Sequence, residues 1–369
     1  MFPITTLLIS VGAISGLVAF LAILMVIADA TIGNYGEVKI TINEQKELIV
    51  QGGRPLLSTL MSEGIFIPSA CGGRGSCGLC KVRGIRGFGQ YLPTELPWIS
   101  PEERGQNIRL SCQIKVKNDL QISIPEELFN VREYRVQVSR LRDLTHDIKE
   151  VTLKLADADK MSFKAGQFIQ FEVPAYEFTD EPVYRAYSIA SAPVNNGEVE
   201  LEIRLVPNGI CTTYVHRHLK EGDQVVINGP YGDFFLRDTD RDIVFIAGGS
   251  GMAPIKSILL DMAERGVARK VTYFFGAKAR ADLFLMAEMK ALEGKLVNFS
   301  FVPSLSVPEE DDNWEGETGM ITDTVAKHLS SGDNVEAYLC GSPGMIDACV
   351  KVLTAGGVPE ELIYYDKFA

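Results

Sequence analysis

The sequence has few histidines and tryptophans, four and two in 369 residues, and it lacks an excess of basic residues. Because its formal net charge is −12, we do not expect a nucleic-acid partner, which would require clustered Lys and Arg. No internal repeat and no Ser-His-Asp arrangement is apparent. His216 and His218 lie two apart, so they would not share one face of a helix. The chemistry of this chain must therefore come from other residue types.

One long hydrophobic run covers the N-terminus. No charged residue occurs between Thr6 and Ala28, and about 20 apolar residues suffice for a helix to span a bilayer. A cleaved signal peptide is the alternative, favoured by the small residues Ala28 and Ala30, although no Lys or Arg precedes the run. The first basic residue, Lys39, follows the run. The positive-inside rule then predicts a single-pass anchor in the inner (cytoplasmic) membrane, with the soluble domains facing the cytoplasm.

Cysteine is the most informative residue type. Of seven cysteines, Cys71, Cys77 and Cys80 lie within ten residues rich in glycine, and Cys112 follows. Four thiolates suit a [2Fe–2S] cluster, although the first gap holds five residues rather than the four of plant-type ferredoxins. A zinc site usually pairs two CxxC motifs, whereas one is present here, and disulfide frameworks are typical of small secreted domains. We therefore predict that these four cysteines are the ligands of a [2Fe–2S] cluster.

The segment that follows the hydrophobic run alternates like a small sheet with one main helix. Apolar residues on one face predict a helix over 56–62, and period-two alternation predicts the strands. Strands are expected at 38–43, 46–50, 81–82, 113–116 and 120–124. With the four cysteines, this pattern resembles the β-grasp ferredoxin domain. We place a transmembrane helix and linker at 1–31 and the [2Fe–2S] domain at 32–129.

Two further domains are expected. Short strands separated by turn signals predict an antiparallel β-barrel over 130–240, and alternating strands and helices predict a doubly wound α/β domain with a parallel sheet over 241–369. In the barrel we expect strands at 134–138, 148–155, 166–173, 187–189, 199–205 and 224–227, and a helix at 214–219. In the α/β domain we expect strands at 243–247, 270–275, 297–302, 335–340 and 363–365, and helices at 252–265, 283–292, 322–329 and 345–355.

The barrel carries the short motif Arg185-Ala-Tyr187-Ser188. It resembles the flavin motif of the ferredoxin–NADP reductase family, which implies an FAD-binding barrel. The arginine would pair with a pyrophosphate, the tyrosine ring would lie against the isoalloxazine, and the serine hydroxyl would reach the flavin N5. Four residues alone are a weak signal, because a buried barrel often contains an Arg or a Tyr.

Downstream motifs strengthen this interpretation. A glycine and two hydroxyls at a helix N-terminus suit phosphate, and a glycine-rich turn from a strand into a helix suits pyrophosphate, although the G-x-G-x-x-G fingerprint is absent. Cys340 ends a sheet strand at the carboxyl edge, where ligands bind in such folds. The residues that we expect to bind phosphates are Gly209, Thr212 and Thr213 in the barrel and Gly248, Gly249 and Gly251 in the last domain.

The order of membrane helix, C-x₅-C-x₂-C…C domain, flavin barrel and nucleotide domain resembles one family over essentially the whole chain: the F subunit of the sodium-translocating NADH:quinone reductase. Local matches are Pro93-Thr-Glu-Leu96 and Gly249-Ser-Gly-Met-Ala-Pro254. The family usually carries a long insertion before its R-x-Y-S motif, whereas here Val173 is almost directly followed by Glu181.

The resemblance implies a membrane-anchored oxidoreductase that passes electrons from NADH to FAD and then to the [2Fe–2S] cluster. The flavin is needed because the cluster accepts one electron at a time, whereas a hydride carries two. The implied partners are integral membrane subunits of a respiratory complex, with quinone (ubiquinone) as the eventual acceptor and sodium transport as the outcome. A membrane-bound reductase that supplies an oxygenase is the alternative, and a non-enzymatic interaction protein is a third.

Two expectations concern nucleotide use. We expect NADH rather than NADPH, chiefly by resemblance, although Lys278 and Arg280 could meet a 2′-phosphate. In the resembling reductases an aromatic residue near the C-terminus commonly covers the flavin face, which implies that role for Phe368. Strand 363–365 would leave the residues from Asp366 onward projecting from the sheet. With Ser188 and Cys340, Phe368 completes the set of expected catalytic residues.

Overall fold

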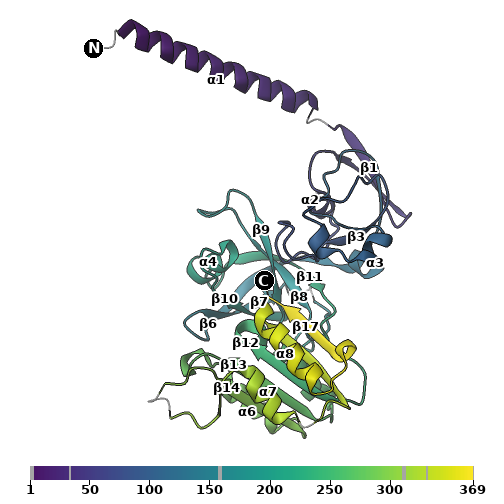
Figure 1. Ribbon diagram of the computed structural model, residues 1–369, viewed down its shortest axis with the longest axis vertical. Coiled ribbons are helices and arrows are strands. Elements are labelled where there is room, and N and C mark those ends of the chain that lie inside the picture. The colour runs from purple at the N-terminus through teal and green to yellow at the C-terminus, as the bar shows by residue number, and fades with distance from the viewer. Residues whose placement is uncertain (1–3, 33–34, 157–159, 310–312, 330, 369) are drawn as a thin grey trace. The chain divides into compact units, whose positions relative to one another are not determined.

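A computed structural model describes residues 4–32, 35–156, 160–309, 313–329 and 331–368 (Figure 1). By contacts the chain divides into two compact units. One consists of Met1–Ile67 and Gly73–Phe129, and the other of Pro68–Gly72 and Asn130–Ala369.

Helix α1 spans Ile4–Ile32. Its segment Ile9–Val26 has a mean hydropathy of 2.5, and none of this segment is buried. In the described part of the chain α1 is the one helix long and apolar enough to cross a membrane. Apolar side chains left in water cost free energy in proportion to their area, and a bilayer removes that cost. By length and composition, α1 is therefore able to span a membrane.

The first unit contains a five-stranded sheet in the order β2-β1-β5-β3-β4. Strands β1 and β5 pair in parallel, and the other neighbours pair antiparallel. Alternate residues of β1 point into the core, where they meet buried leucines of α2. The elements are β1 (Glu37–Ile42), β2 (Lys46–Gln51), α2 (Leu56–Ser62), β3 (Lys81–Arg86), α3 (Pro101–Gly105), β4 (Ile108–Leu110) and β5 (Leu120–Ser123).

One predicted strand in this unit is wrong. Residues 113–116 make no ladder, and only an isolated bridge joins Lys115 to Pro55. Ile114 and Val116 are buried on alternate positions, which imitates a strand, but their backbone groups bond to the residues that lead into α2. Strand β4, which lies just before Cys112, was not predicted.

The second unit begins with six antiparallel strands in the order β10-β7-β6-β11-β8-β9. A bridge between Ile189 and Leu201 joins the two edges and closes the sheet into a barrel around its own core. The elements are β6 (Arg132–Asp143), β7 (Ile148–Leu155), β8 (Phe168–Val173), β9 (Val183–Ser188), β10 (Glu198–Arg204), α4 (Ile210–Arg217) and β11 (Gln224–Tyr231).

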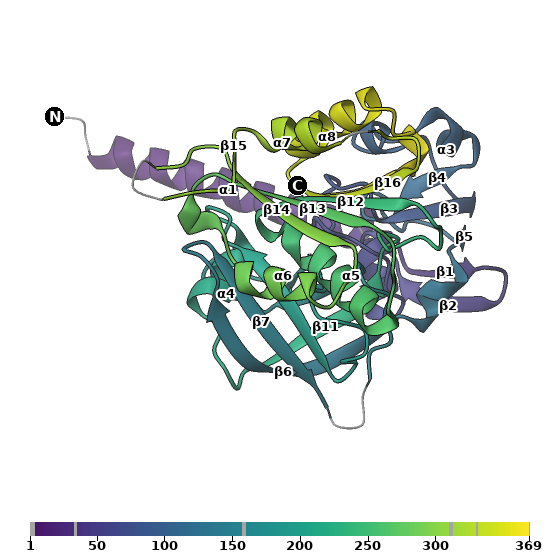
Figure 2. The ribbon, with the colours of Figure 1, turned by 90° about the horizontal axis from the view of Figure 1, so that it is seen from below.

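A parallel sheet in the order β15-β14-β13-β12-β16-β17 follows in the same unit. Figure 2 shows α5 and α6 on one face and α7 and α8 on the other, and separate buried clusters fill the two faces. The strand order reverses between β12 and β16, so a crevice opens where those strands end. The elements are β12 (Asp242–Gly248), α5 (Met252–Arg265), β13 (Val271–Ala277), α6 (Met286–Glu293), β14 (Phe299–Leu305), β15 (Glu317–Thr318), α7 (Ile321–His328), β16 (Val335–Gly341), α8 (Pro343–Ala355) and β17 (Ile363–Lys367).

The C-terminal segment corrects a second expectation. Strand β17 continues to Lys367, and Asp366 pairs with Cys340 in the ladder rather than projecting from the sheet. The Phe368 N–H donates a hydrogen bond to Gly341 O at 2.9 Å, and its half-buried ring packs against the core. Ala369 lies outside the described residues.

Candidate functional site

The glycines of the cysteine loop have left-handed backbone. Gly73, Gly75 and Gly78 have φ of +85°, +73° and +69°, a region that residues with a Cβ rarely adopt. Such turns aim successive backbone N–H groups at a common point, which suits sulfur anions. The loop is thus built for an anionic group.

The cysteine side chains fit an iron–sulfur cluster by their chemistry. Cys71 and Cys77 are half-buried, and Cys80 and Cys112 are buried. The Ser111 backbone N–H and hydroxyl both donate to Cys80 O, at 2.8 and 2.9 Å, which joins these two positions. Interaction with Cys112 and burial raise the pKa of the Cys80 thiol. Among the described residues no three His, Cys, Asp or Glu side chains converge on one metal position, but a [2Fe–2S] cluster divides its four thiolates between two irons.

Strand β9 holds the flavin motif. Arg185 is half-buried and donates through Nη1 to Tyr184 O at 2.7 Å, and Ser188 is buried at the strand's end. The hydroxyl of Tyr187 is buried and has no hydrogen-bond partner within the described residues, and burial raises its pKa. An unpaired buried hydroxyl costs free energy, and a bound group with a polar edge would satisfy it. The residues present therefore fit a flavin.

The first turn of α4 forms hydrogen bonds with the loop that precedes it. Gly209 is the N-cap residue, and Thr212 and Thr213 are buried in the first turn. The Thr212 hydroxyl accepts a hydrogen bond from Val206 N–H at 3.1 Å. A Cβ at Gly209 would lie 2.5 Å from that hydroxyl, so glycine is required here for close approach.

A pocket of about 250 Å³ lies where the parallel strands end. Gly248 and Gly249 line it, as does Lys278, whereas Arg280 and Cys340 are not among its lining residues. Gly251 lies against β16, because a Cβ there would approach Cys340 O to 2.3 Å. Cys340 is fully buried, and burial raises the pKa of its thiol.

The sequence analysis missed two residues of this pocket. Arg204 at the end of β10 forms an ion pair with Asp147, its Nε lying 2.7 Å from Oδ2. The Arg204 guanidinium would lie 3.2 Å from a Cβ at Gly249. It thus places positive charge beside the glycine turn. No local motif marks this pair, because 57 residues separate its members.

Family models match three parts of the chain. A 2Fe-2S iron-sulfur cluster binding domain matches residues 40–117, an oxidoreductase FAD-binding domain matches 135–236, and an oxidoreductase NAD-binding domain matches 245–351. Among solved structures, a cytochrome P450 reductase from Amycolatopsis is 27% identical, with a TM-score of 0.73 over 90% of this chain and 98% of that chain. The ferredoxin reductase of carbazole 1,9a-dioxygenase is also 27% identical, with a TM-score of 0.69 over 90% and 99%.

Curated relatives cover more of the chain. The F subunit of the Na⁺-translocating NADH-quinone reductase of Neisseria meningitidis is 37% identical over 95% of this chain and 96% of its own length. The F subunit of the Idiomarina loihiensis enzyme is 36% identical over 98% of each chain. This chain belongs to the family of these F subunits. It therefore carries FAD-binding, NAD-binding and [2Fe–2S] domains and is an NADH oxidoreductase, as predicted.

The alignment with the Idiomarina relative also shows a difference in length between the two chains. It spans 402 positions with the Idiomarina relative, although this chain has 369 residues, so that relative carries residues that this chain lacks. In this chain β8 and β9 are joined by residues 174–182, a short connection within which Tyr176 and Thr179 pair.

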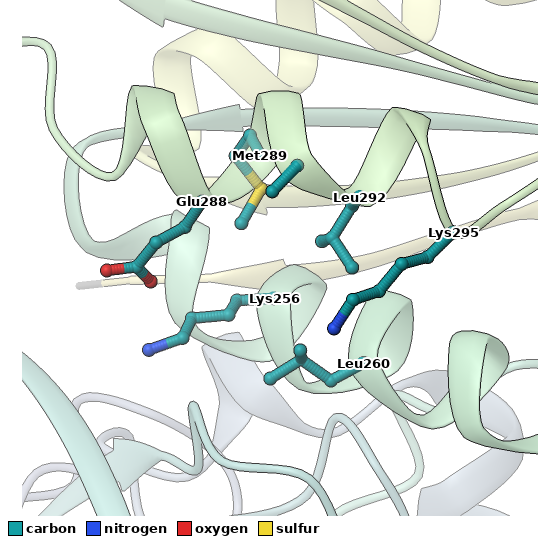
Figure 3. A pocket seen from close by; sticks show the side chains of 7 residues that line it. Lys256, Leu260, Glu288, Met289, Leu292 and Lys295 are labelled. Carbon is teal, nitrogen blue, oxygen red and sulfur yellow. The ribbon is translucent and has the colours of Figure 1, made fainter.

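A cluster of charged side chains surrounds Lys256 of α5. Lys256 of α5 has Nζ 3.1 Å from Glu200 Oε2, 3.5 Å from Glu150 Oε2 and 3.9 Å from Glu202 Oε1. Burial lowers the pKa of Lys256, but the three carboxylates together raise it above its ordinary value. Figure 3 shows Lys256 at one side of a second pocket of about 210 Å³, with Glu288 beside it and Lys295 on the other side.

Proposed function

We propose that this chain is the electron-input subunit of a membrane-bound NADH:quinone reductase of the sodium-translocating type. In this proposal electrons pass from NADH through FAD and the [2Fe–2S] cluster to integral membrane subunits, with quinone as the eventual acceptor. The proposed domains are 1–31 for the membrane helix and linker, 32–129 for the cluster, 130–240 for FAD and 241–369 for NADH.

The extent of the family alignment supports this choice. Coverage of 98% leaves about seven of 369 residues unaligned, and α1 starts at Ile4, so the alignment must include most of the membrane helix. The two three-domain reductases of similar fold cover 90% of the chain, and the remaining tenth is large enough to hold all of α1. The aligned apolar helix favours a family that works at a membrane.

The protein's own residues would bind and orient the nucleotide. The glycine turn at Gly248 and Gly249 leaves room for a pyrophosphate, and the Arg204 guanidinium, held by Asp147, would offset its negative charge. We expect NADH to be preferred over NADPH, and Lys278 is the pocket residue that would weaken that preference. A comparison of kcat/KM for the two nucleotides in Lys278→Ala and wild type tests this assignment.

On the barrel, Arg185 would bind the FAD pyrophosphate, Tyr187 would lie along the ring system and Ser188 would orient the flavin edge. FAD when bound takes up a hydride and releases single electrons, which a [2Fe–2S] cluster requires. We also propose that Cys340 and Phe368 lie near the nicotinamide. Phe368 would cover the flavin face and move aside for the nicotinamide.

The cluster assignment is tested by Cys77→Ala. We expect this variant to lose the cluster's EPR signal and quinone reduction while NADH still reduces the flavin, because the flavin precedes the cluster. Full EPR intensity would refute Cys77 as a ligand. Arg185→Ala should lose FAD on dilution, and full retention of FAD would refute that role.

An alternative function is supply of electrons to an oxygenase. It is favoured by the fold likeness to a cytochrome P450 reductase and to the reductase of carbazole 1,9a-dioxygenase. Purification of the intact chain from detergent-solubilised membranes distinguishes the two proposals. Co-purifying integral membrane subunits and NADH-driven quinone reduction support the first, whereas a co-purifying oxygenase supports the second.

A further inference from the structure

The tryptophan of the ferredoxin domain lies against the cysteine loop. Gly78 sits between Cys77 and Cys80, and a Cβ built on it would lie 3.0 Å from Trp98 Cε3 and 3.1 Å from Trp98 Cβ. The indole therefore packs directly on the peptide backbone between two of the proposed cluster ligands. A side chain at residue 78 would displace it.

Trp98 is not a core residue of the ferredoxin domain. The residue is 38% exposed, and it belongs neither to the buried cluster of this domain nor to the half-buried residues packed on that cluster. Leu79, the next residue of the loop, is 41% exposed. The position of Trp98 is therefore set by the Gly78 backbone and by its own turn rather than by the core of the domain.

A buried ion pair holds the segment that carries this tryptophan. Glu95 accepts hydrogen bonds from Arg109 Nε and Nη2 at 2.9 and 2.7 Å, and from the N–H groups of Leu92 and Leu110. The backbone N–H of Trp98 donates to the backbone carbonyl of Glu95 at 3.0 Å. Arg109 lies in β4, two residues before Ser111, which binds Cys80 O. The same framework thus holds the cysteines and the indole.

We propose that Trp98 is a positioning residue of the iron–sulfur site: its indole fixes the peptide at Gly78 and shields the loop between Cys77 and Cys80 from water. Hydrogen bonds to the sulfurs and solvent exposure set the potential of such clusters. Water favours the more highly charged reduced form. Removing the indole therefore moves the midpoint potential to less negative values and opens a path for loss of iron.

The first test measures the fluorescence of Trp98 itself. Trp98 and Trp314 are the two tryptophans of the chain, so Trp314→Phe leaves Trp98 as the sole indole, and Trp98→Phe leaves Trp314 as the matched reference. We expect Trp98 emission to be quenched in the cluster-loaded protein and to rise several-fold when a chelator removes the cluster or in Cys77→Ala. Trp314 emission should change much less. Equal Trp98 emission with and without cluster would overturn the proposal.

The second test measures the cluster in Trp98→Ala, Trp98→Phe and Leu96→Ala. Leu96 is an exposed apolar residue of the same short turn and serves as the matched control. We expect Trp98→Ala to raise the EPR-monitored midpoint potential and to speed chelator-driven iron loss about tenfold, the usual scale for groups that support metal ligands. Trp98→Phe should restore most of both properties, and Leu96→Ala should match wild type.

An unchanged potential and lifetime in Trp98→Ala would refute the positioning role. The proposal rests on Cys77 and Cys80 as cluster ligands, and Cys77→Ala distinguishes that failure. Full EPR intensity in Cys77→Ala would overturn the ligand assignment, and with it the role of Trp98. Loss of the signal in Cys77→Ala with an unaltered cluster in Trp98→Ala would overturn only the role of Trp98.

Discussion

The ferredoxin domain and the flavin–nucleotide unit both bury charged side chains, but they satisfy them differently. In the ferredoxin domain Glu95 and Arg109 are 0% and 3% exposed, and each carboxylate oxygen of Glu95 accepts two hydrogen bonds. In the other unit Lys256 faces three carboxylates, and both oxygens of Glu202 have no hydrogen-bond partner within the described residues. A satisfied pair can rigidify a site, whereas an unsatisfied charge costs free energy.

The buried glutamates of the two regions also differ in the direction in which their pKa values are shifted. Burial raises the pKa of Glu95, but the hydrogen bonds from Arg109 and from two backbone N–H groups outweigh it, so the pKa falls below its usual range. Burial raises the pKa of Glu202 to about 8, and the Lys256 charge only partly opposes it. One site thus stabilises a carboxylate, and the other stabilises a neutral carboxyl group.

The largest expected effect is that of Arg109→Ala. It leaves Glu95 buried and unpaired and releases the loop whose Gly89 and Gln90 carbonyls accept from Arg109. We expect the unfolding free energy of the ferredoxin domain to fall by about 3–5 kcal/mol, measured by urea titration through the visible circular dichroism of the cluster. Arg104→Ala, an exposed change in the same segment, should cost less than about 0.5 kcal/mol. Equal losses in the two variants would contradict this account.

Lys256→Met should cost less, about 2–3 kcal/mol, because Glu150 keeps its ion pair with Arg142 at 2.8 Å and Glu202 is neutral below about pH 8. The pocket beside Lys256 can admit water, which lowers the cost of the remaining charges. Urea unfolding followed by flavin fluorescence measures the effect. Lys295→Met is the matched control, because Lys295 is exposed and lines the same pocket. A loss of unfolding free energy as large as that of Arg109→Ala would mean that water in the pocket does not stabilise the remaining charges.

Replacing Glu95 and Glu202 by glutamine should change the unfolding free energy in opposite directions. Glu95→Gln loses charge-assisted hydrogen bonds and should destabilise by about 2–3 kcal/mol. Glu202→Gln removes an acid whose oxygens accept no hydrogen bond within the described residues, and it should raise the unfolding free energy by between zero and about 2 kcal/mol. Thermal and urea unfolding of both variants against wild type tests the contrast. Destabilisation of the two variants to the same extent would show that Glu202 is satisfied after all.

The smallest effect per measured step is the change in stability for each pH unit, no more than about 1.4 kcal/mol for one proton. Since the Glu202 pKa is about 8 in the folded state and about 4.3 when unfolded, the folded state binds more protons between these values. Its contribution to stability is therefore complete below about pH 4.3 and is lost as pH rises through 8. The Glu95 contribution runs the other way: it is present above about pH 4.3 and is lost as pH falls through the lowered folded pKa.

This slope is measured as a difference between proteins. The stability of wild type minus that of Glu202→Gln should fall between about pH 5 and 8, by no more than about 1.4 kcal/mol per pH unit for one proton. Other groups, such as His216, cancel in the difference because both proteins carry them. A flat difference across this range would place the folded pKa of Glu202 near its ordinary value.

Local patterns in the sequence determined much of this architecture. The uncharged run predicts α1, apolar spacing predicts α2 and α5 at the bounds that the structure has, and the order of cysteine, flavin and glycine motifs predicts three domains of the right kinds. Each of these signals depends on neighbours in the chain, because helix and strand periodicity and cofactor loops are short-range properties.

Only the tertiary structure brought distant residues together. It set Arg204 beside Gly249, laid Trp98 on Gly78 and buried Glu202 beside Lys256 without a hydrogen bond. It also turned the alternating residues 113–116 into a connection, because their partners lie before α2 rather than in a strand. These outcomes depend on which surfaces meet when the elements pack, and no local periodicity encodes a partner far along the chain.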